Sequence, residues 1–357
     1  MSTQPMSQRL TPTVFEEADP FGLLLIVIQS LLLVGAAAAF FFQSPWTMPL
    51  LLAFLLVSGV AWGTRQAVAA RVLTFLMTIT TVVTLALIAV FLFLEAIPAF
   101  QLMGIDILLP LDGDLWNPST NTFSLVPMIW GTAITTVVAT LVAGPLGVAG
   151  ALFISEIAPE QVREVVKPGV EILAGIPSIV YGFIGFTIIN PYVSTELSTG
   201  FGALLPIGVV IGLMALPTVV SVAEDAISTV PEAMKSGSLA MGATDWQTMK
   251  SVTVPAAFSG ISAAVLLGIG RAIGETMAAT VMIAHVQELP QPAFDVFDSG
   301  ETLTTLIAGN FGPAVGTEYY LSALFAAGVV LFVIVTTLSI ASQYIEKRMQ
   351  RKLGGDR

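Results

Sequence analysis

The stretch Phe258–Ala284, FSGISAAVLLGIGRAIGETMAATVMIA, is long enough to cross a bilayer as a helix, and its only charged residues are Arg271 and Glu275. A helix needs about 20 predominantly apolar residues to span the hydrocarbon core. Exposing an arginine to lipid at that depth is costly, so Arg271 is expected to face the protein interior or a wet cavity. The stretch therefore predicts a membrane-spanning helix that carries a functional charge.

The composition places the rest of the chain in a membrane as well. Of its 357 residues, 55% are apolar and 10% are charged, and the mean hydropathy is +0.89, whereas soluble domains have about 25% charged residues. We predict an all-α integral membrane protein with about eight transmembrane helices. The predicted spans are Phe21–Phe42, Trp46–Trp62, Val72–Leu94, Met128–Ser155, Val170–Asn190, Phe201–Val222, Phe258–Ala284 and Tyr320–Tyr344.

The positive charges predict the orientation of the chain. Every Lys and Arg except Arg271 falls on one side of the eight-span arrangement. By the positive-inside rule that side is the cytoplasm, so we expect a multi-pass protein of the cell (inner, cytoplasmic) membrane with both termini cytoplasmic. The outer loops carry Asp and Glu but no Lys or Arg. Their negative charge reflects either an acidic or saline environment or a docking face for a soluble partner.

Prolines mark three of the predicted spans. Pro145, Pro177 and Pro217 each follow an apolar run and are expected to interrupt the fourth, fifth and sixth spans. Proline removes a backbone hydrogen bond and clashes with the preceding turn. Such breaks are tolerated in membranes where helices are buried or line a cavity. Three in succession predict a packed transport core, although kinked membrane helices are common individually.

The residues of the longest inner loop, Glu224–Ala257, predict two helices that are separated by a turn. Pro231 and Glu232 suit the first turn of a helix, and Gly242 suits the turn that follows. Thr244 begins the sequence TDWQ, which matches a capping box at the start of a second helix. Exposed apolar residues such as Trp246 would make this loop a surface that docks another protein. The alternative is a helix pair lying on the lipid headgroups.

The second half of this loop resembles the EAA loop of ABC-transporter permeases. Gly242, nine further residues and Val252-Thr253-Val254-Pro255 follow the pattern G-x9-I-x-L-P with Val in place of Ile and Leu. The first half departs from the family, because the family's glutamate falls on Ser236 and the nearest carboxylate is Glu232. We call Glu224–Ala257 the coupling loop, after the role that this resemblance implies.

Five further phrases make the resemblance more specific, and together they run from Trp116 towards the C-terminus. They resemble the PstC-type permeases of phosphate-specific ABC importers. The phrases are WNPSTNTFSLVPMIWGT, AGPLGVAGALFISEIAP, LAGIPSIVYGFIG, GRAIGETMA and TLTTLIAGNFG. The resemblance implies a type I ABC importer permease core that imports inorganic phosphate. It also implies a heterodimer with a PstA-type permease, a PstB-type ATPase dimer inside and a PstS-type phosphate-binding protein outside, with no nucleic-acid partner.

A division of the chain follows from the spans and the resemblance together. Residues 1–97 form a cytoplasmic tail and three peripheral transmembrane helices, residues 98–127 an extracytoplasmic loop, and residues 346–357 a basic cytoplasmic tail. Residues 128–345 form the permease core of five transmembrane helices, with the coupling loop at 224–257. Since relatives usually have one helix before the outer loop, two of the N-terminal helices are additional.

Arg271 and Glu275 are predicted to act together on the substrate pathway. Their i, i+4 spacing places them on one helix face and within reach. A guanidinium can bond two oxygens of a tetrahedral oxyanion at once. Our hypothesis is that Glu275 holds Arg271 while the path is empty and that phosphate competes for the same donors. The alternative is a buried ion pair that only fixes packing, with Gly270 and Gly274 forming a small-residue contact surface.

The energy source must lie outside this chain. No G-x-x-x-x-G-K-[ST] sequence occurs, so ATP and Mg are expected on the partner ATPase, and neither a cofactor nor a catalytic residue is predicted here. The absence of cysteine and the single histidine predict no metal site. Two alternatives to a phosphate importer remain open: an ABC permease for sulfate or molybdate, and a secondary anion transporter in which the ion pair couples protons to the anion.

Overall fold

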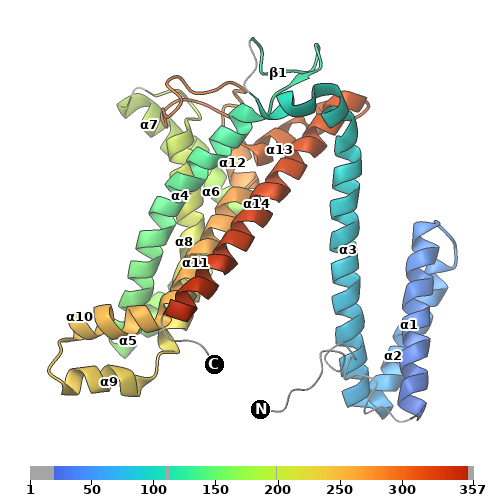
Figure 1. Cartoon of the computed structure of the whole chain (residues 1–357), viewed down its shortest axis with the longest axis horizontal. Coiled ribbons are helices and arrows are strands. Elements are labelled where there is room, and N and C mark those ends of the chain that lie inside the picture. The colour runs from blue at the N-terminus through green and yellow to red at the C-terminus, as the bar shows by residue number, and fades with distance from the viewer. Residues whose placement is uncertain (1–19, 110–112, 198, 353–357) are drawn as a thin grey trace. The chain divides into compact units, whose positions relative to one another are not determined.

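The computed structural model in Figure 1 describes residues 20–109, 113–197 and 199–352, and almost all of its regular structure is helical. The chain divides into two compact units, Met1–Phe91 and Leu92–Arg357. Seven of the described helices are long and apolar enough to cross a membrane, and an eighth span results if one bent helix pair is counted. The predicted fold class is therefore confirmed. The basic tail predicted at residues 346–357 lies partly outside the described residues.

The first unit consists of α1 (Pro20–Phe41), α2 (Thr47–Thr64) and the first part of α3 (Gln66–Met103). Its small core includes Ile26, Phe54 and Val72. The buried amide nitrogen of Gln29 donates a hydrogen bond of 3.0 Å to the hydroxyl of Ser58, which links α1 to α2. Most outward side chains of these helices are large and apolar, as contact with lipid requires.

The second unit is built around α4 (Val126–Leu152), α8 (Leu204–Ser228), α11 (Val254–Gly274) and α14 (Glu318–Lys352). Glycines let α4 and α8 approach closely. A Cβ added at Gly147 would lie 2.7 Å from Val219, and one added at Gly208 would lie 2.6 Å from Val138. Such small-residue contacts are the usual way in which helices associate tightly in lipid. These two helices therefore form the rigid centre of the unit.

The fifth predicted span is bent rather than straight. Residues Glu160–Ala174 form α5, and α6 (Ser178–Ile184), a π-helical segment and α7 (Asn190–Glu196) follow at an angle of 89°. The bend falls at Gly175-Ile176-Pro177, where proline cannot continue the preceding helix. Pro177 thus marks a real break, as predicted. The axis of the span changes there, so Val170–Asn190 is not one continuous helix.

Pro145 and Pro217 do not interrupt their helices, and this part of the prediction was wrong. α4 continues through Pro145, and α8 continues through Pro217. A single proline removes one backbone hydrogen bond, and tight packing by neighbouring helices outweighs that loss in a membrane. The further break occurs elsewhere, between α11 and the short helix α12 (Met277–Met282).

The two ends of the second unit differ in structure (Figure 1). At one end lie α5, the coupling loop helices α9 (Glu232–Ala240) and α10 (Asp245–Thr248), and the end of α14. At the other end lie a 3-10 helix (Gly104–Leu108), the hairpin β1 (Trp116–Asn117) and β2 (Thr122–Phe123), and helix α13 (Leu303–Ala314). Trp116 packs there against Phe123 and Tyr320 in an aromatic cluster. We call these the inner and outer ends, after the orientation that the positive charges of the sequence predict.

Candidate functional site

Arg271 lies in the last turn of α11, three residues before the helix ends at Gly274. Its guanidinium donates a hydrogen bond of 3.0 Å to the hydroxyl of Thr218 on α8. A cation near the C-terminal end of a helix is favoured by the helix dipole. Arg271 is nevertheless exposed rather than packed away, so most of its donors remain available to an anion.

Arg271 lines a cavity of about 560 Å³ between α8, α11 and α14. Its walls are mainly apolar, and the polar side chains besides Arg271 and Thr218 come from α14. They are Ser339, Ser342 and Gln343. A small number of converging polar groups in an apolar cavity is the usual character of a ligand site. Arg271 supplies the one positive charge among these lining residues.

The sequence analysis missed Thr218 and the polar stripe of α14. A signal for the stripe was present, because Ser339, Ser342 and Gln343 follow the i, i+3, i+4 spacing of one helix face in an otherwise apolar span. Thr218 gave no such signal, since threonine is unremarkable next to the proline of a membrane helix. Only the packing of α8 against α11 brings it to Arg271.

Glu275 is not paired with Arg271, which corrects the prediction of an ion pair on one helix face. The helix ends at Gly274, and Glu275 has an extended backbone with φ −68° and ψ 122°. Its carboxylate accepts a hydrogen bond of 3.1 Å from the amide of Ala278 in α12, and its carbonyl accepts one of 2.9 Å from Thr304 on α13. None of the ion pairs found among residues 20–109, 113–197 and 199–352 joins Arg271 to Glu275.

The physical reason is that the i, i+4 rule holds only while a helix continues. A carboxylate that bonds free amides at the start of a following helix stabilises a break instead. The glycine at 274 lowers the cost of ending α11 there. Gly270 and Gly274 also have no atom of this chain within 4 Å of an added Cβ, so their predicted small-residue contact does not form within the described chain.

The coupling loop has the predicted order of helix, glycine turn and helix. α9 ends at Ala240, Gly242 has a φ of +89° that favours glycine, and α10 begins at Asp245. Thr244 and Gln247 form the predicted capping box, with hydrogen bonds of 3.3 and 2.9 Å. These two predictions are confirmed.

The coupling loop exposes large apolar side chains at its tip. Met241 is 90% exposed and Trp246 is 67% exposed. Ser236, at the position of the family glutamate, donates a hydrogen bond of 2.9 Å to the carbonyl of Glu232 and remains exposed. Val254 and Pro255 lie in the first turn of α11 and are half-buried. The tip therefore offers an apolar surface on a rigid support.

A second polar cluster lies at the outer end and includes the single histidine. The Nδ1 atom of His285 lies 3.0 Å from the carboxylate of Glu301, which is fully buried. The hydroxyl of Thr305 donates a hydrogen bond of 2.6 Å to the same carboxylate. The hydrogen bond to Glu301 raises the pKa of His285 above its usual value, against the opposing effect of burial.

This pair predicts a pH-dependent stability. Since the pKa of His285 is raised in the folded protein, the stabilising charge pair is fully present below about pH 6.5 and is lost as pH rises through the raised value. We expect His285→Gln to lower the melting temperature of the purified protein at acidic pH and much less at alkaline pH. Because the His285 side chain is 39% exposed, the effect should not exceed about 1 kcal/mol. Parallel pH profiles for the two proteins would contradict this assignment.

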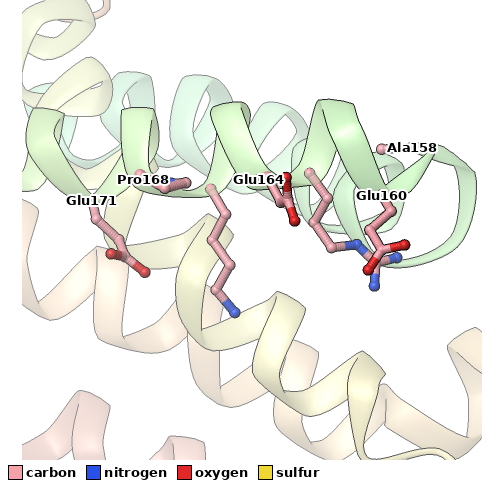
Figure 2. Close-up of a pocket in the computed structure, with 7 residues that line it drawn as sticks. Ala158, Glu160, Glu164, Pro168 and Glu171 are labelled. Atoms are coloured by element: carbon pink, nitrogen blue, oxygen red, sulfur yellow. The ribbon is translucent and has the colours of Figure 1, made fainter.

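A hollow of about 690 Å³ lies beside α5 at the inner end. Figure 2 shows Glu160, Glu164 and Glu171 along the helix face that lines it, with Pro168 between them. Arg163 and Lys167 also line it. Acidic and basic side chains alternate there, so the hollow has no single charge that would select an anion.

Comparisons with known proteins agree with this architecture. Residues 144–351 match the family model described as "Binding-protein-dependent transport system inner membrane component". The chain is 38% identical to a probable ABC transporter permease protein of Bacillus subtilis, YqgH, over 73% of this chain and 84% of the relative. It is 32% identical to the phosphate transport system permease protein PstC of Mesorhizobium japonicum, over 84% of this chain and 93% of the relative.

The match to PstC covers 84% of this chain, and residues Leu92–Arg357 make up a smaller share of it. The likeness therefore reaches into the unit Met1–Phe91. Among solved structures, the chain resembles a bacterial alginate ABC transporter in complex with its periplasmic protein. The TM-score is 0.54 at 15% identity, over 80% of this chain and 98% of that one. This likeness supports the fold alone.

Proposed function

This chain belongs to the family of binding-protein-dependent transport system inner membrane components, and we propose that it is the transmembrane permease subunit of an ATP-driven importer of inorganic phosphate. The observation that carries the proposal is the 32% identity to a phosphate permease over most of both chains. The exposed arginine in an apolar cavity between α8, α11 and α14 supports it chemically, because a guanidinium bonds two oxygens of a phosphate at once.

In this proposal phosphate meets Arg271 during its passage and leaves again. The guanidinium keeps one bond to Thr218 and presents its remaining donors to the cavity. Since no carboxylate of residues 20–109, 113–197 or 199–352 pairs with it, phosphate need not displace one from this part of the chain. The bond must be weak enough to release the anion, and the partial solvation of an exposed arginine limits its strength. Glu275 contributes by fixing the break between α11 and α12 that leaves Arg271 at a helix end.

The chain is a multi-pass membrane subunit and is not the ATPase, and we propose the finer assignments that the sequence predicted. The partners are a PstA-type permease, a PstB-type ATPase dimer that holds ATP and Mg, and a PstS-type phosphate-binding protein. The inner end faces the cytoplasm together with both termini, and the acidic outer end faces the binding protein. Phosphate enclosed in a carrier protein is not repelled by that negative face. The division of the chain at residues 97, 127 and 345 belongs to the same proposal.

The exposed tip of the coupling loop is the proposed contact with the ATPase. An apolar tip on short, capped helices suits a protein partner, because exposed methionine and tryptophan side chains gain most when a partner covers them. A helix pair on lipid headgroups would instead carry its apolar residues along one continuous face. Met241 and Trp246 flank the glycine turn, so they project from the loop's apex.

The other oxyanions and the secondary-transport alternative make different predictions. Sulfate and molybdate share the tetrahedral shape, so chemistry at Arg271 does not separate them from phosphate, and the relative named PstC favours phosphate. A secondary transporter that couples protons through the Arg271–Glu275 pair loses its main support, because that pair does not form.

Purification of the tagged chain from membranes in mild detergent tests this assignment. We expect a second permease and an ATPase to co-purify with the wild-type chain. The double variant Met241→Glu, Trp246→Glu should lose the ATPase and retain the second permease. Recovery of the chain alone from wild-type membranes, or phosphate uptake that excess sulfate or molybdate abolishes, would contradict the proposal.

A further inference from the structure

A partly buried ion pair joins the coupling loop to the inner end of α4. The ammonium of Lys235 on α9 lies 2.6 Å from the carboxylate of Glu156, and the two side chains are only 14% and 13% exposed. Glu156 belongs to the π-helical turn Phe153–Ile157, which continues α4. In the described part of the chain, no other ion pair or side-chain hydrogen bond connects α9 to α4.

Each of the two charges lies at a helix end where the helix dipole disfavours a charge of its sign. Lys235 lies in the first turn of α9, where the helix dipole disfavours a cation, and Glu156 lies one residue before the end of its helical segment, where the dipole disfavours an anion. On α9, Lys235 also lies 4.0 Å from the exposed carboxylate of Glu232. Its contact with Glu156 is shorter and less exposed, so this pair fixes α9 on α4.

Apart from this pair, the chain attaches α9 to the membrane helices at both of its ends, and at the far end α10 continues through Met249–Thr253 into α11. The start of α9 is joined to α8 by Thr229-Val230-Pro231. The hydroxyls of Thr248 and Ser238, 2.9 Å apart, hold α10 against α9, so the loop tip behaves as one body. The ion pair adds a direct contact with the inner end of α4, which packs closely on α8, so the loop tip is tied to these helices as well as to α11.

The connection continues from Glu156 into α5. Arg163 on α5 donates hydrogen bonds to the carbonyls of Ile154 and Ser155, at 2.7 and 2.5 Å. Lys167, one turn further along α5, lies 2.5 Å from the buried carboxylate of Glu224 on α8. Glu160, Glu164 and Glu171 line the same hollow as Arg163 and Lys167 (Figure 2). α5 then leads directly to the bend at Gly175-Ile176-Pro177.

Resting on the proposed function, we propose that the Lys235–Glu156 pair transmits movement of the coupling loop to α4, and that Arg163 passes it through α5 to the bent span. Lys235, Glu156 and Arg163 are positioning residues, since none of the three lines the cavity of Arg271. Through this contact, displacement of α9 by the ATPase acts on α4 and α8 directly, in addition to its action on α11 through α10. The pair therefore sets how much phosphate moves for each ATP hydrolysed.

Charge reversal tests the pair in the complete complex of both permeases, the ATPases and the binding protein, reconstituted in liposomes. We expect Lys235→Glu and Glu156→Lys each to lower the phosphate imported per ATP hydrolysed by about tenfold, within the range of allosteric coupling. ATP hydrolysis should persist, and the double reversal should restore most of the ratio. Lys250→Glu, an exposed charge reversal in the same loop, is the matched control and should leave the ratio unchanged.

Two outcomes would overturn the inference while leaving the proposed function intact. One is an unchanged ratio in both single variants, and the other is no recovery in the double reversal, in each case with normal ATP-driven uptake by the wild type. Absence of ATP-driven uptake by the wild type would instead count against the proposed function itself.

A cross-link provides a test that does not depend on comparing separately folded variants. Because the chain has no cysteine, Lys235→Cys with Glu156→Cys can be joined selectively by a bifunctional thiol reagent. We expect the unlinked sample to import little phosphate per ATP and the linked sample to regain it. No gain on linking, or a double-cysteine chain that does not assemble at all, would show that the pair serves folding rather than coupling.

Discussion

Replacing Arg271 with lysine is expected to lower ATP-driven phosphate uptake by about 10- to 100-fold while the complex stays assembled. Hydrogen bonds to charged groups contribute about 1.5–3 kcal/mol each, and every 1.4 kcal/mol is a factor of about ten. Lysine keeps the charge but loses the planar fork that bonds two oxygens. Folding should survive, because Arg271 is exposed and its one described hydrogen bond is to Thr218. Uptake of labelled phosphate measures the loss of transport, and co-purification of the partners shows whether the complex stays assembled.

Glu275→Gln is the informative companion to this variant. A glutamine side chain can still accept the hydrogen bond from the amide of Ala278, so we expect uptake close to that of the wild type. If Glu275 instead acted through its charge on Arg271, the two substitutions would lower uptake together. Normal uptake by Arg271→Lys would contradict the role of Arg271 directly.

Of the substitutions proposed for this chain, Gly131→Ala is expected to cause the largest loss of folded protein. A Cβ at this position on α4 would lie 2.0 Å from the backbone carbonyl oxygen of Glu301, whose side chain is fully buried beside α13. A backbone atom cannot rotate away as the end of a flexible side chain can. The segment around Glu301 must therefore move away from α4. Overpacking typically costs about 1–3 kcal/mol and occasionally more, and we expect this site to exceed about 3 kcal/mol.

The matched control is Gly59→Ala in α2, where an added Cβ meets no atom within 4 Å. Alanine is the better helix former by about 1 kcal/mol, so the control should be neutral or slightly stabilising. Yield of monodisperse protein and melting temperature in detergent distinguish the two substitutions. Equal yields and melting temperatures would show that α4 and the segment around Glu301 are not packed as described.

Features with a local cause were predictable from the sequence. Apolar runs of membrane length gave the spans, and the TDWQ sequence gave the capping box of α10, because both depend on residues close together in the chain. The glycine turn at Gly242 follows from the same local chemistry. In each case a few neighbouring residues carry the interaction that forms the element.

Two kinds of feature were not predictable from the sequence. In one, opposing local interactions compete, and in the other, the contacting residues lie far apart in the chain. Three prolines gave the same local signal, yet only Pro177 lies at a break, because packing decides whether a lost hydrogen bond ends a helix. Arg271 and Glu275 had the spacing of an ion pair, but α11 ends at Gly274, and the Glu275 carboxylate accepts a hydrogen bond from the amide of Ala278 instead. Lys235 and Glu156 meet only through the fold, so no pattern along the chain indicated their contact.

Phosphate uptake in vesicles decides whether this chain imports phosphate with energy from a separate ATPase. The vesicles are right-side-out, with ATP trapped inside and labelled phosphate outside. The binding protein is added to one sample and omitted from the other. We predict uptake that requires both ATP and the binding protein and that is unaffected when proton and sodium gradients are collapsed. Uptake by this chain without ATP, driven by either gradient, would contradict the account.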